Sequence, residues 1–158
     1  MKKRSKIIYL SIFIVLLCCN SLLADVLMIP AASFRPYSGS YYRNDGSTVY
    51  SSSYSSQYFY APVILPQGTR VQKIVFYFLD DGVYEITLSL FRRNCYVNDR
   101  QTMAEISTFG SASNWRVNTT HTIYTPIINM NGYSYFLELY FESYGTAYQV
   151  QAVKIIYK

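Results

Sequence analysis

The chain has 158 residues, of which 51% are hydrophobic and 18% aromatic, and it carries 14 lysines and arginines against 9 acidic residues. This length is enough for one domain with a substantial core but not for two. Four of the basic residues and none of the acidic ones lie within residues 1–24, which leaves ten against nine in the remainder. So small a charge difference argues against binding to nucleic acid or to anionic lipid.

Residues 1–24 have the layout of a secretory signal peptide. A basic start is followed by an almost unbroken apolar run, Ile7–Cys19, and a small residue, Ala24, stands at the expected cut. The apolar run is short for a helix that spans a membrane. We therefore expect a secreted protein, periplasmic or extracellular, with a signal peptide over residues 1–24 and a single domain over residues 25–158.

The three cysteines bear on anchoring and on disulfides. A lipid anchor at Cys18 or Cys19 is an alternative to soluble export, although Leu17 is not the small residue that lipoprotein signals place before the modified cysteine. After cleavage only Cys95 remains, which excludes a disulfide within the chain. We expect Cys95 to be a small buried hydrophobe, with a bridge to another chain as the alternative.

The exported part begins with a predicted edge strand, Asp25–Ile29, which ends at Pro30. An irregular stretch, Ala31–Tyr42, follows because prolines and a glycine interrupt it. Asn44-Asp45-Gly46 then predicts a turn, since asparagine and aspartate tolerate left-handed backbone conformations and glycine favours them.

A tyrosine- and serine-rich stretch, Ser47–Tyr60, comes next. The tyrosines of this stretch that share one parity are Tyr50, Tyr54, Tyr58 and Tyr60. In a strand they point to one side of the sheet. Their four-residue spacing also suits one face of a helix, but serine is a weak helix former and tyrosine favours strands. We therefore expect one strand with a tyrosine stripe, which faces either the core or the solvent.

Two apolar runs form the predicted centre of the fold. They cover Tyr60–Leu65 and Val71–Leu79, and Pro66-Gln67-Gly68 lies between them. Proline fixes its own φ and glycine permits positive φ, so this joint predicts a turn between two strands.

The remaining strands follow from alternating polarity and turn signals. The predicted ranges are Tyr84–Phe91, Thr102–Thr108, Val117–Thr125, Tyr133–Glu142 and Tyr148–Tyr157. A hairpin turn is predicted at Asn129–Gly132, and a change of parity near Gln151-Ala152 predicts a β-bulge. About eight strands without an amphipathic helix indicate an all-β fold, a two-sheet antiparallel β-sandwich of jelly-roll type.

Most of residues 47–158 resembles a widespread pattern in exported bacterial proteins of unknown function. The pattern reads aromatic-x-Ala-Pro-Val-x-Leu-Pro-x-Gly, followed by an acidic turn, a strand that ends in arginine and an apolar-basic-apolar last strand. The residues that carry it are Phe59, Ala61-Pro62-Val63, Leu65-Pro66, Gly68, Val71, Ile74, Asp80-Asp81, Leu90-Phe91-Arg92-Arg93, Val153-Lys154-Ile155 and Tyr157. The chain departs from it at Thr69, usually alanine, and in its tyrosine content. The resemblance implies a β-sandwich and no catalytic residue.

Residues for catalysis or metal binding are sparse. His121 is the only histidine, and no serine lies in a G-x-S-x-G elbow. No histidine or cysteine cluster has the spacing of a zinc site. Asp80 and Asp81 are explained by turn chemistry, with calcium binding as the alternative. We therefore expect no enzyme activity, no cofactor and no metal.

Aromatic residues supply the candidate contacts, because tyrosine and tryptophan offer a flat apolar face with a polar edge. The candidates are Trp115, Tyr41, Tyr42 and the tyrosine stripe. We expect a secreted, non-enzymatic β-sandwich that acts as an interaction or structural subunit, through a protein partner or self-association. The alternative is a carbohydrate-binding module in which these aromatic residues stack on sugar rings. Among the strand glutamates, Glu85, Glu138 and Glu142, no spacing selects a catalytic pair.

Overall fold

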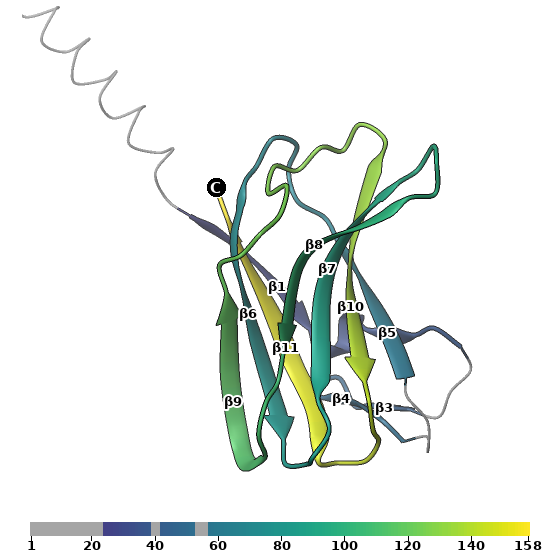
Figure 1. Cartoon of the computed structure of the whole chain (residues 1–158), viewed down its shortest axis with the longest axis vertical. Coiled ribbons are helices and arrows are strands. Elements are labelled where there is room, and N and C mark those ends of the chain that lie inside the picture. The colour runs from purple at the N-terminus through teal and green to yellow at the C-terminus, as the bar shows by residue number, and fades with distance from the viewer. Residues whose placement is uncertain (1–23, 39–41, 53–56) are drawn as a thin grey trace, which may run out of the picture.

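A computed structural model describes residues 24–38, 42–52 and 57–158 of the chain, and within them the fold is a β-sandwich (Figure 1). Two antiparallel sheets pack face to face, which confirms the predicted all-β sandwich. The described residues form eleven strands rather than about eight, and their only helical element is a single 3-10 turn, η1 (Ala31–Ser33). No helix among the described residues is long and apolar enough to cross a membrane.

The first sheet has six strands. They are β1 (Asp25–Pro30), β3 (Tyr42–Asn44), β4 (Val49–Ser51), β6 (Val71–Asp80), β9 (Ala112–Thr120) and β11 (Tyr148–Tyr157). Their order is β3-β4-β11-β6-β9, and β1 also pairs with β11. The register of β11 on β6 shifts between Val150 and Ala152, which confirms the predicted bulge.

The second sheet has five strands. They are β2 (Arg35–Pro36), β5 (Gln57–Val63), β7 (Ile86–Asn94), β8 (Arg100–Ser107) and β10 (Tyr133–Phe141). Their order is β2-β5-β10-β7-β8, so that β10 lies at the centre. The strands β7 and β8 extend past the sandwich as a hairpin (Figure 1). The strand predicted over Tyr84–Phe91 therefore continues further, because Arg92 and Arg93 still pair with β8.

The core lies between the sheets and follows from the period of two along each strand. On β10 the alternate residues Tyr135, Leu137, Leu139 and Phe141 are buried, as their alternation with polar residues predicts. The largest fully buried side chains are Phe34, Phe59, Phe76, Phe141, Ile74, Ile86, Leu88, Leu90, Met103, Ile128, Leu137 and Leu139. Burial of each such side chain stabilises the fold by about 1.5–3 kcal/mol relative to its exposure.

Turns carry the chain from one sheet to the other. Pro66-Gln67-Gly68 joins β5 of the five-stranded sheet to β6 of the six-stranded sheet, and Gly68 has a φ of 83°. Asn129–Gly132 precedes β10 as predicted, with a φ of 85° at Gly132, but it is not a hairpin turn. The preceding strand, β9, belongs to the other sheet, so its neighbours cannot pair with β10.

The prediction of one strand over Ser47–Tyr60 is wrong. The strand β4 ends at Ser51 and pairs with β11, whereas β5 begins at Gln57 and pairs with β10. The chain therefore changes sheets within this stretch, and a shared parity of tyrosines cannot reveal such a change. Residues 53–56 lie outside the described residues, as do residues 1–23, which include most of the predicted signal peptide (1–24) and both Cys18 and Cys19.

Candidate functional site

The outward-facing side of the five-stranded sheet, here called the outer face, carries an unusual set of side chains. Alternation places them opposite the buried residues of each strand. On β5 and β10 the outward residues include Tyr58, Tyr60, Phe136, Glu138 and Tyr140, none of which is needed to fill the core. Aromatic side chains on a solvent-facing side point to contact with something outside the chain.

Strand register sorts these side chains into three parallel rows across β5, β10, β7 and β8. The first row is Tyr58, Tyr140, Thr87 and Ser107; the second is Tyr60, Glu138, Ser89 and Glu105; the third is Pro62, Phe136, Phe91 and Thr102. The middle row is polar, and each of the other two carries aromatic rings. The outer face is therefore a polar strip between two aromatic borders.

Ring contacts hold the borders in place. The rings of Tyr58 and Tyr140 lie 4.8 Å apart between centroids, and those of Phe136 and Phe91 lie 5.5 Å apart in a stacked arrangement. Tyr60 links the rows because its ring lies 5.8 Å from that of Phe136. Such cross-strand aromatic pairs fix the orientation of the exposed rings before any ligand arrives.

An ion pair reaches over the third row to the middle row, from Arg100, which lies opposite Arg93 beyond the third row. Nη1 of Arg100 lies 2.7 Å from Oε2 of Glu138, and the Arg100 guanidinium lies 4.2 Å above the ring centroid of Phe91. Glu138 is only 7% exposed, whereas the Arg100 side chain is half exposed. Glu138 and Phe91 therefore fix the guanidinium on the side that faces the sheet, and its other side is open to solvent.

Tyr60 is coupled to the same carboxylate. Burial, a hydrogen bond to Glu138 and the charge of Glu138 raise the pKa of Tyr60 to about 12. The phenol therefore stays protonated at neutral pH and can serve as a hydrogen-bond donor within the middle row.

Two of the hollows that the described residues form lie on the outer face. The first, here called the groove, has a volume of about 460 Å³ and is lined by Tyr58, Thr87, Ser89, Phe91, Arg100, Thr102, Glu105, Glu138 and Tyr140. The second, here called the aromatic hollow, has a volume of about 430 Å³ and is lined by Tyr37, Tyr60, Ala61, Pro62, Arg93, Ser134, Tyr135 and Phe136. Both combine flat apolar rings with a few fixed polar groups, the composition that binds a ligand with an apolar face and several hydroxyl groups.

The predicted aromatic contacts are only partly brought together. Tyr58 and Tyr60 lie on the outer face, but Tyr42 packs on the core, with its ring 5.8 Å from that of Phe59. Tyr50 lies on β4 and borders a small hollow in the six-stranded sheet's half of the molecule. Trp115 lies on β9 of the six-stranded sheet, away from the groove.

The remaining predicted aromatic residues, Tyr41 and Tyr54, lie outside the described residues. The expectation of a buried Cys95 is wrong: the thiol is exposed in the β7–β8 hairpin, and its bridge to another chain stays a prediction. His121 is also exposed, in the segment that follows β9.

Sequence reasoning selected only Tyr58 of the nine groove residues as a ligand contact. The eight that it missed are Thr87, Ser89, Phe91, Arg100, Thr102, Glu105, Glu138 and Tyr140. One signal was present, because Tyr140 shares the parity of Ser134 and Glu138 on a strand whose other parity is wholly apolar. An aromatic residue on the polar side of an amphipathic strand has no place in the core, so its ring must face outward.

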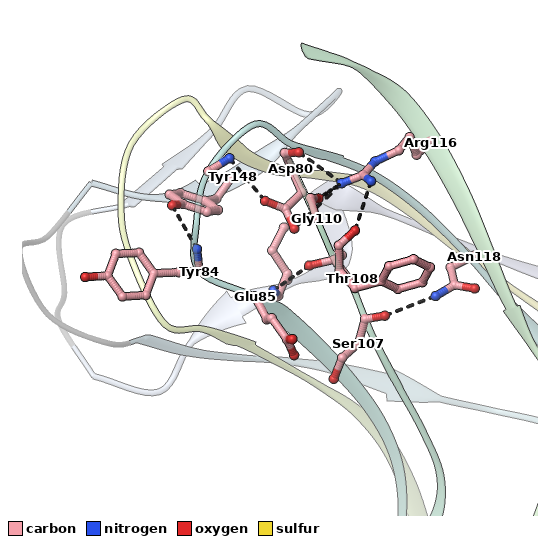
Figure 2. Close-up of polar contacts among 12 residues, drawn as sticks. Asp80, Tyr84, Glu85, Ser107, Thr108, Gly110, Arg116, Asn118 and Tyr148 are labelled. Atoms are coloured by element: carbon pink, nitrogen blue, oxygen red, sulfur yellow. Dashed lines mark hydrogen bonds and ion pairs between the residues drawn. The ribbon is translucent and has the colours of Figure 1, made fainter. Parts of the chain in front are cut away.

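A second polar cluster, shown in Figure 2, has a different character. Arg116 of β9 donates to the backbone carbonyls of Asp80, Gly110 and Phe109 at 3.0, 2.6 and 3.1 Å. Its Nη2 also lies 3.8 Å from the Asp80 carboxylate, which is only 1% exposed. These contacts tie β9 to β6 and to the β8–β9 connection.

The cluster also bears on the calcium alternative. The Asp80 carboxylate is buried beside Arg116, and Asp81 is exposed in the following loop. Among the described residues, no group of three histidine, cysteine or acidic side chains is arranged to hold a metal ion.

No model of a protein family matches the chain, and no curated protein matches it in sequence. Solved structures do resemble it. The C-terminal CBM6 of the laminarinase LamC from Zobellia galactanivorans has a TM-score of 0.55 at 16% identity, over 83% of this chain and 98% of the other. The CBM22-2 xylan-binding domain of Paenibacillus barcinonensis Xyn10C has a TM-score of 0.55 at 15% identity, over 80% and 97%.

A third similar structure is the CBM36-1 domain of a multidomain xylanase from the hindgut metagenome of Trinervitermes trinervoides. Its TM-score is 0.51 at 12% identity, over 83% of this chain and 96% of the other. At these identities the likeness concerns the fold alone. This chain spans nearly the full length of each of these three domains, so the shared fold is a whole sandwich and not a fragment.

Proposed function

We propose that the protein binds a polysaccharide, without catalysis, on the outer face of its five-stranded sheet. The observation that carries this proposal is the groove, in which a strip of hydrogen-bonding groups runs between the Tyr58–Tyr140 pair and Phe91. A pyranose ring has apolar faces and a rim of hydroxyl groups. Stacking on aromatic rings and hydrogen bonding to a fixed polar strip are the two interactions that such a ligand needs.

Each border of the groove has a defined role in this function. The tilted rings of Tyr58 and Tyr140 form the platform on which a sugar ring stacks. Arg100 donates to sugar hydroxyl oxygens through the guanidinium N–H groups that its bond to Glu138 leaves over. The aromatic hollow, reached past Tyr60 and Phe136, extends the surface along the sheet for a longer chain.

The fold supports the proposal at a coarser level, since similar folds occur in carbohydrate-binding modules. The first expectation from sequence, a subunit for a protein partner or for self-association, stays a prediction, and the outer face favours the carbohydrate alternative. Export from the cytoplasm and membership of the exported bacterial group stay part of the proposal.

Affinity gel electrophoresis and isothermal titration calorimetry with soluble xylan and laminarin test this function on the purified protein. We expect retardation by at least one polysaccharide. Tyr58→Ala removes half of the platform. We expect the binding free energy to become less favourable by about 2 kcal/mol, which corresponds to roughly thirty-fold weaker binding.

The matched control is Trp115→Ala, because Tyr58 is 42% exposed and Trp115 is 45% exposed. The two changes remove equally accessible rings from opposite sheets, and we expect Trp115→Ala to alter the Kd by less than a factor of two. Binding that depends on Trp115 and not on Tyr58 would move the site to the six-stranded sheet. The absence of binding to any polysaccharide would refute the proposed function.

A further inference from the structure

We infer that the groove accepts an uncharged stretch of polysaccharide and excludes sugars that carry a carboxylate or a sulfate. This inference rests on the function proposed above and names the class of ligand. Its basis is the distribution of charged side chains along the outer face, whereas stacking on a sugar ring depends on the aromatic side chains.

The groove itself has an excess of negative charge. Three of its lining residues are charged at neutral pH, namely Arg100, Glu105 and Glu138. Arg100 and Glu138 neutralise each other at 2.7 Å. The Glu105 carboxylate accepts a hydrogen bond from Oγ of Ser89 at 3.3 Å, and among the described residues no lysine or arginine pairs with it. One uncompensated negative charge therefore faces the space where the ligand would lie.

Two further carboxylates border the groove on the side of Tyr140. The register of β10 on β7 ends with Phe141 opposite Ile86, and Glu142 and Glu85 follow as the next facing residues. They are joined by a hydrogen bond from the Glu142 backbone N–H to the Glu85 carbonyl, and by one from the Glu85 N–H to the Glu142 carboxylate. Both side chains are exposed, so their charges add to that of Glu105.

The opposite end of the outer face has the opposite sign. Arg93 lines the aromatic hollow, and Arg35 lies opposite Tyr60 on the neighbouring strand β2. A single acidic group is therefore tolerated there, whereas a polymer with a carboxylate on every residue must place one in the groove beside Glu105. Negative charges in such a site weaken the binding of acidic polymers more than they weaken the binding of uncharged ones.

An uncharged sugar has a favourable contact with the same groups. Hydroxyl groups donate to the free oxygens of Glu105, and hydrogen bonds to an ionised acceptor are stronger than neutral ones. Glu105 therefore has two effects of opposite sign: it attracts neutral sugars by hydrogen bonding and repels acidic ones by charge. The quantity that isolates its role is the ratio of the two affinities.

The test compares neutral and acidic homopolymers by affinity gel electrophoresis at pH 7. Xylan and laminarin are the neutral probes, and polygalacturonate and alginate carry a carboxylate on every residue. We expect the protein to bind at least one neutral polymer at least ten-fold more tightly than either acidic polymer. Raising the sodium chloride concentration from 20 to 500 mM should leave the neutral affinity almost unchanged, because no charge on the ligand is screened.

Glu105→Gln keeps the shape of the side chain and removes its charge, and we expect the ratio of neutral to acidic affinity to fall about five- to ten-fold. Asp81→Asn is the control, because it removes the same charge from an exposed loop residue that lines neither hollow. It should leave the ratio within two-fold of the original.

The outcomes separate this inference from the function on which it rests. Equal or tighter binding of polygalacturonate or alginate, or an unchanged ratio in Glu105→Gln, overturns the inference and leaves polysaccharide binding in place. A protein that binds none of the four polymers overturns the proposed function, and the inference with it.

Discussion

The two arginine–carboxylate pairs among the described residues lie in opposite surroundings. Arg116 has its guanidinium occupied by three backbone carbonyls, and its partner Asp80 is almost fully buried. Arg100 makes one hydrogen bond, to Glu138, and half of its side chain faces solvent. The number of guanidinium donors that remain open to solvent, and not the presence of a pair, therefore separates a structural arginine from one that is free to bind.

Both guanidinium groups also lie over an aromatic ring, at 5.2 Å from Phe78 for Arg116 and at 4.2 Å from Phe91 for Arg100. Stacking therefore does not distinguish the two sites either. What differs is the face: Phe78 is part of the core, whereas Phe91 lies on the outer face beneath its arginine.

The largest effect is expected from Arg116→Ala. It leaves the buried Asp80 carboxylate without a cation and removes the donor from three carbonyl groups, so the free energy of unfolding should fall by about 2–4 kcal/mol. Urea unfolding followed by far-ultraviolet circular dichroism measures this loss. Arg43→Ala, at an exposed position on β3, is the control and should change stability by less than about 0.5 kcal/mol. A similarly small effect of Arg116→Ala would contradict the structural role.

Arg100→Ala is expected to lower stability less than Arg116→Ala does, and also to weaken polysaccharide binding. The half-exposed position limits the loss of stability to about 1 kcal/mol. Polysaccharide binding should weaken roughly ten-fold because the guanidinium donors are lost. Calorimetry and urea unfolding on the same variant measure the two effects.

Arg92→Ala is the matched control for that experiment. Arg92 also lies over an aromatic ring, that of Tyr133 at 4.9 Å, and also bonds a neighbouring side chain, Gln101. It lines neither hollow, so we expect no change in affinity. Equal losses of affinity in the two variants would mean that Arg100 has no special access to ligand.

The smallest signal is the titration of Tyr60. Its pKa is raised from the ordinary value of 10 to about 12, so the folded state holds the phenolic proton more tightly than the unfolded chain does. The resulting contribution to stability is fully present below pH 10 and is lost as the pH rises from 10 towards 12. Absorbance at 295 nm should show one phenol titrating near pH 12.

Two variants assign that titration to the groove. Tyr60→Phe should remove the step near pH 12, and Glu138→Gln should lower the pKa of Tyr60, because the hydrogen bond to a carboxylate and its negative charge are lost. A titration curve that stays the same in Tyr60→Phe would assign the raised pKa to another tyrosine.

The fold followed from sequence wherever apolar and polar residues alternate. The buried side of β10 and the bulge near Gln151-Ala152 were both predicted, because core burial enforces a strict period of two and a bulge is the simplest way to break it. The stretch from Ser47 to Tyr60 misled us for a physical reason. Parity fixes which side of a strand a residue faces, but it carries no information on which partner strand, and hence which sheet, the segment joins.

The candidate site was predicted only in its β5 part. Tyr58 and Tyr60 were identified by parity, but the groove also needs Arg100 and Glu105 from β8. Arg100 lies outside the strand predicted over Thr102–Thr108, and Glu105 lies within it. The two residues come close to the tyrosines only because β8 pairs with β7, β7 with β10 and β10 with β5. Trp115 lies outside every predicted strand for the same reason, since the pairing of β9 with β6 depends on a partner far away in the chain.

The central place of β10 in the five-stranded sheet has a consequence for the time course of folding. Every row of the groove passes through β10, whose partner β5 lies much earlier in the chain. Contacts between such distant segments form slowly, because the long intervening loop must first be closed. Until β10 inserts, β5 and β7 each have an unpaired edge that can join another chain. The groove is therefore completed only after nearly the whole chain has been made, and a truncation before Tyr133 would yield an aggregating protein rather than a weaker binder.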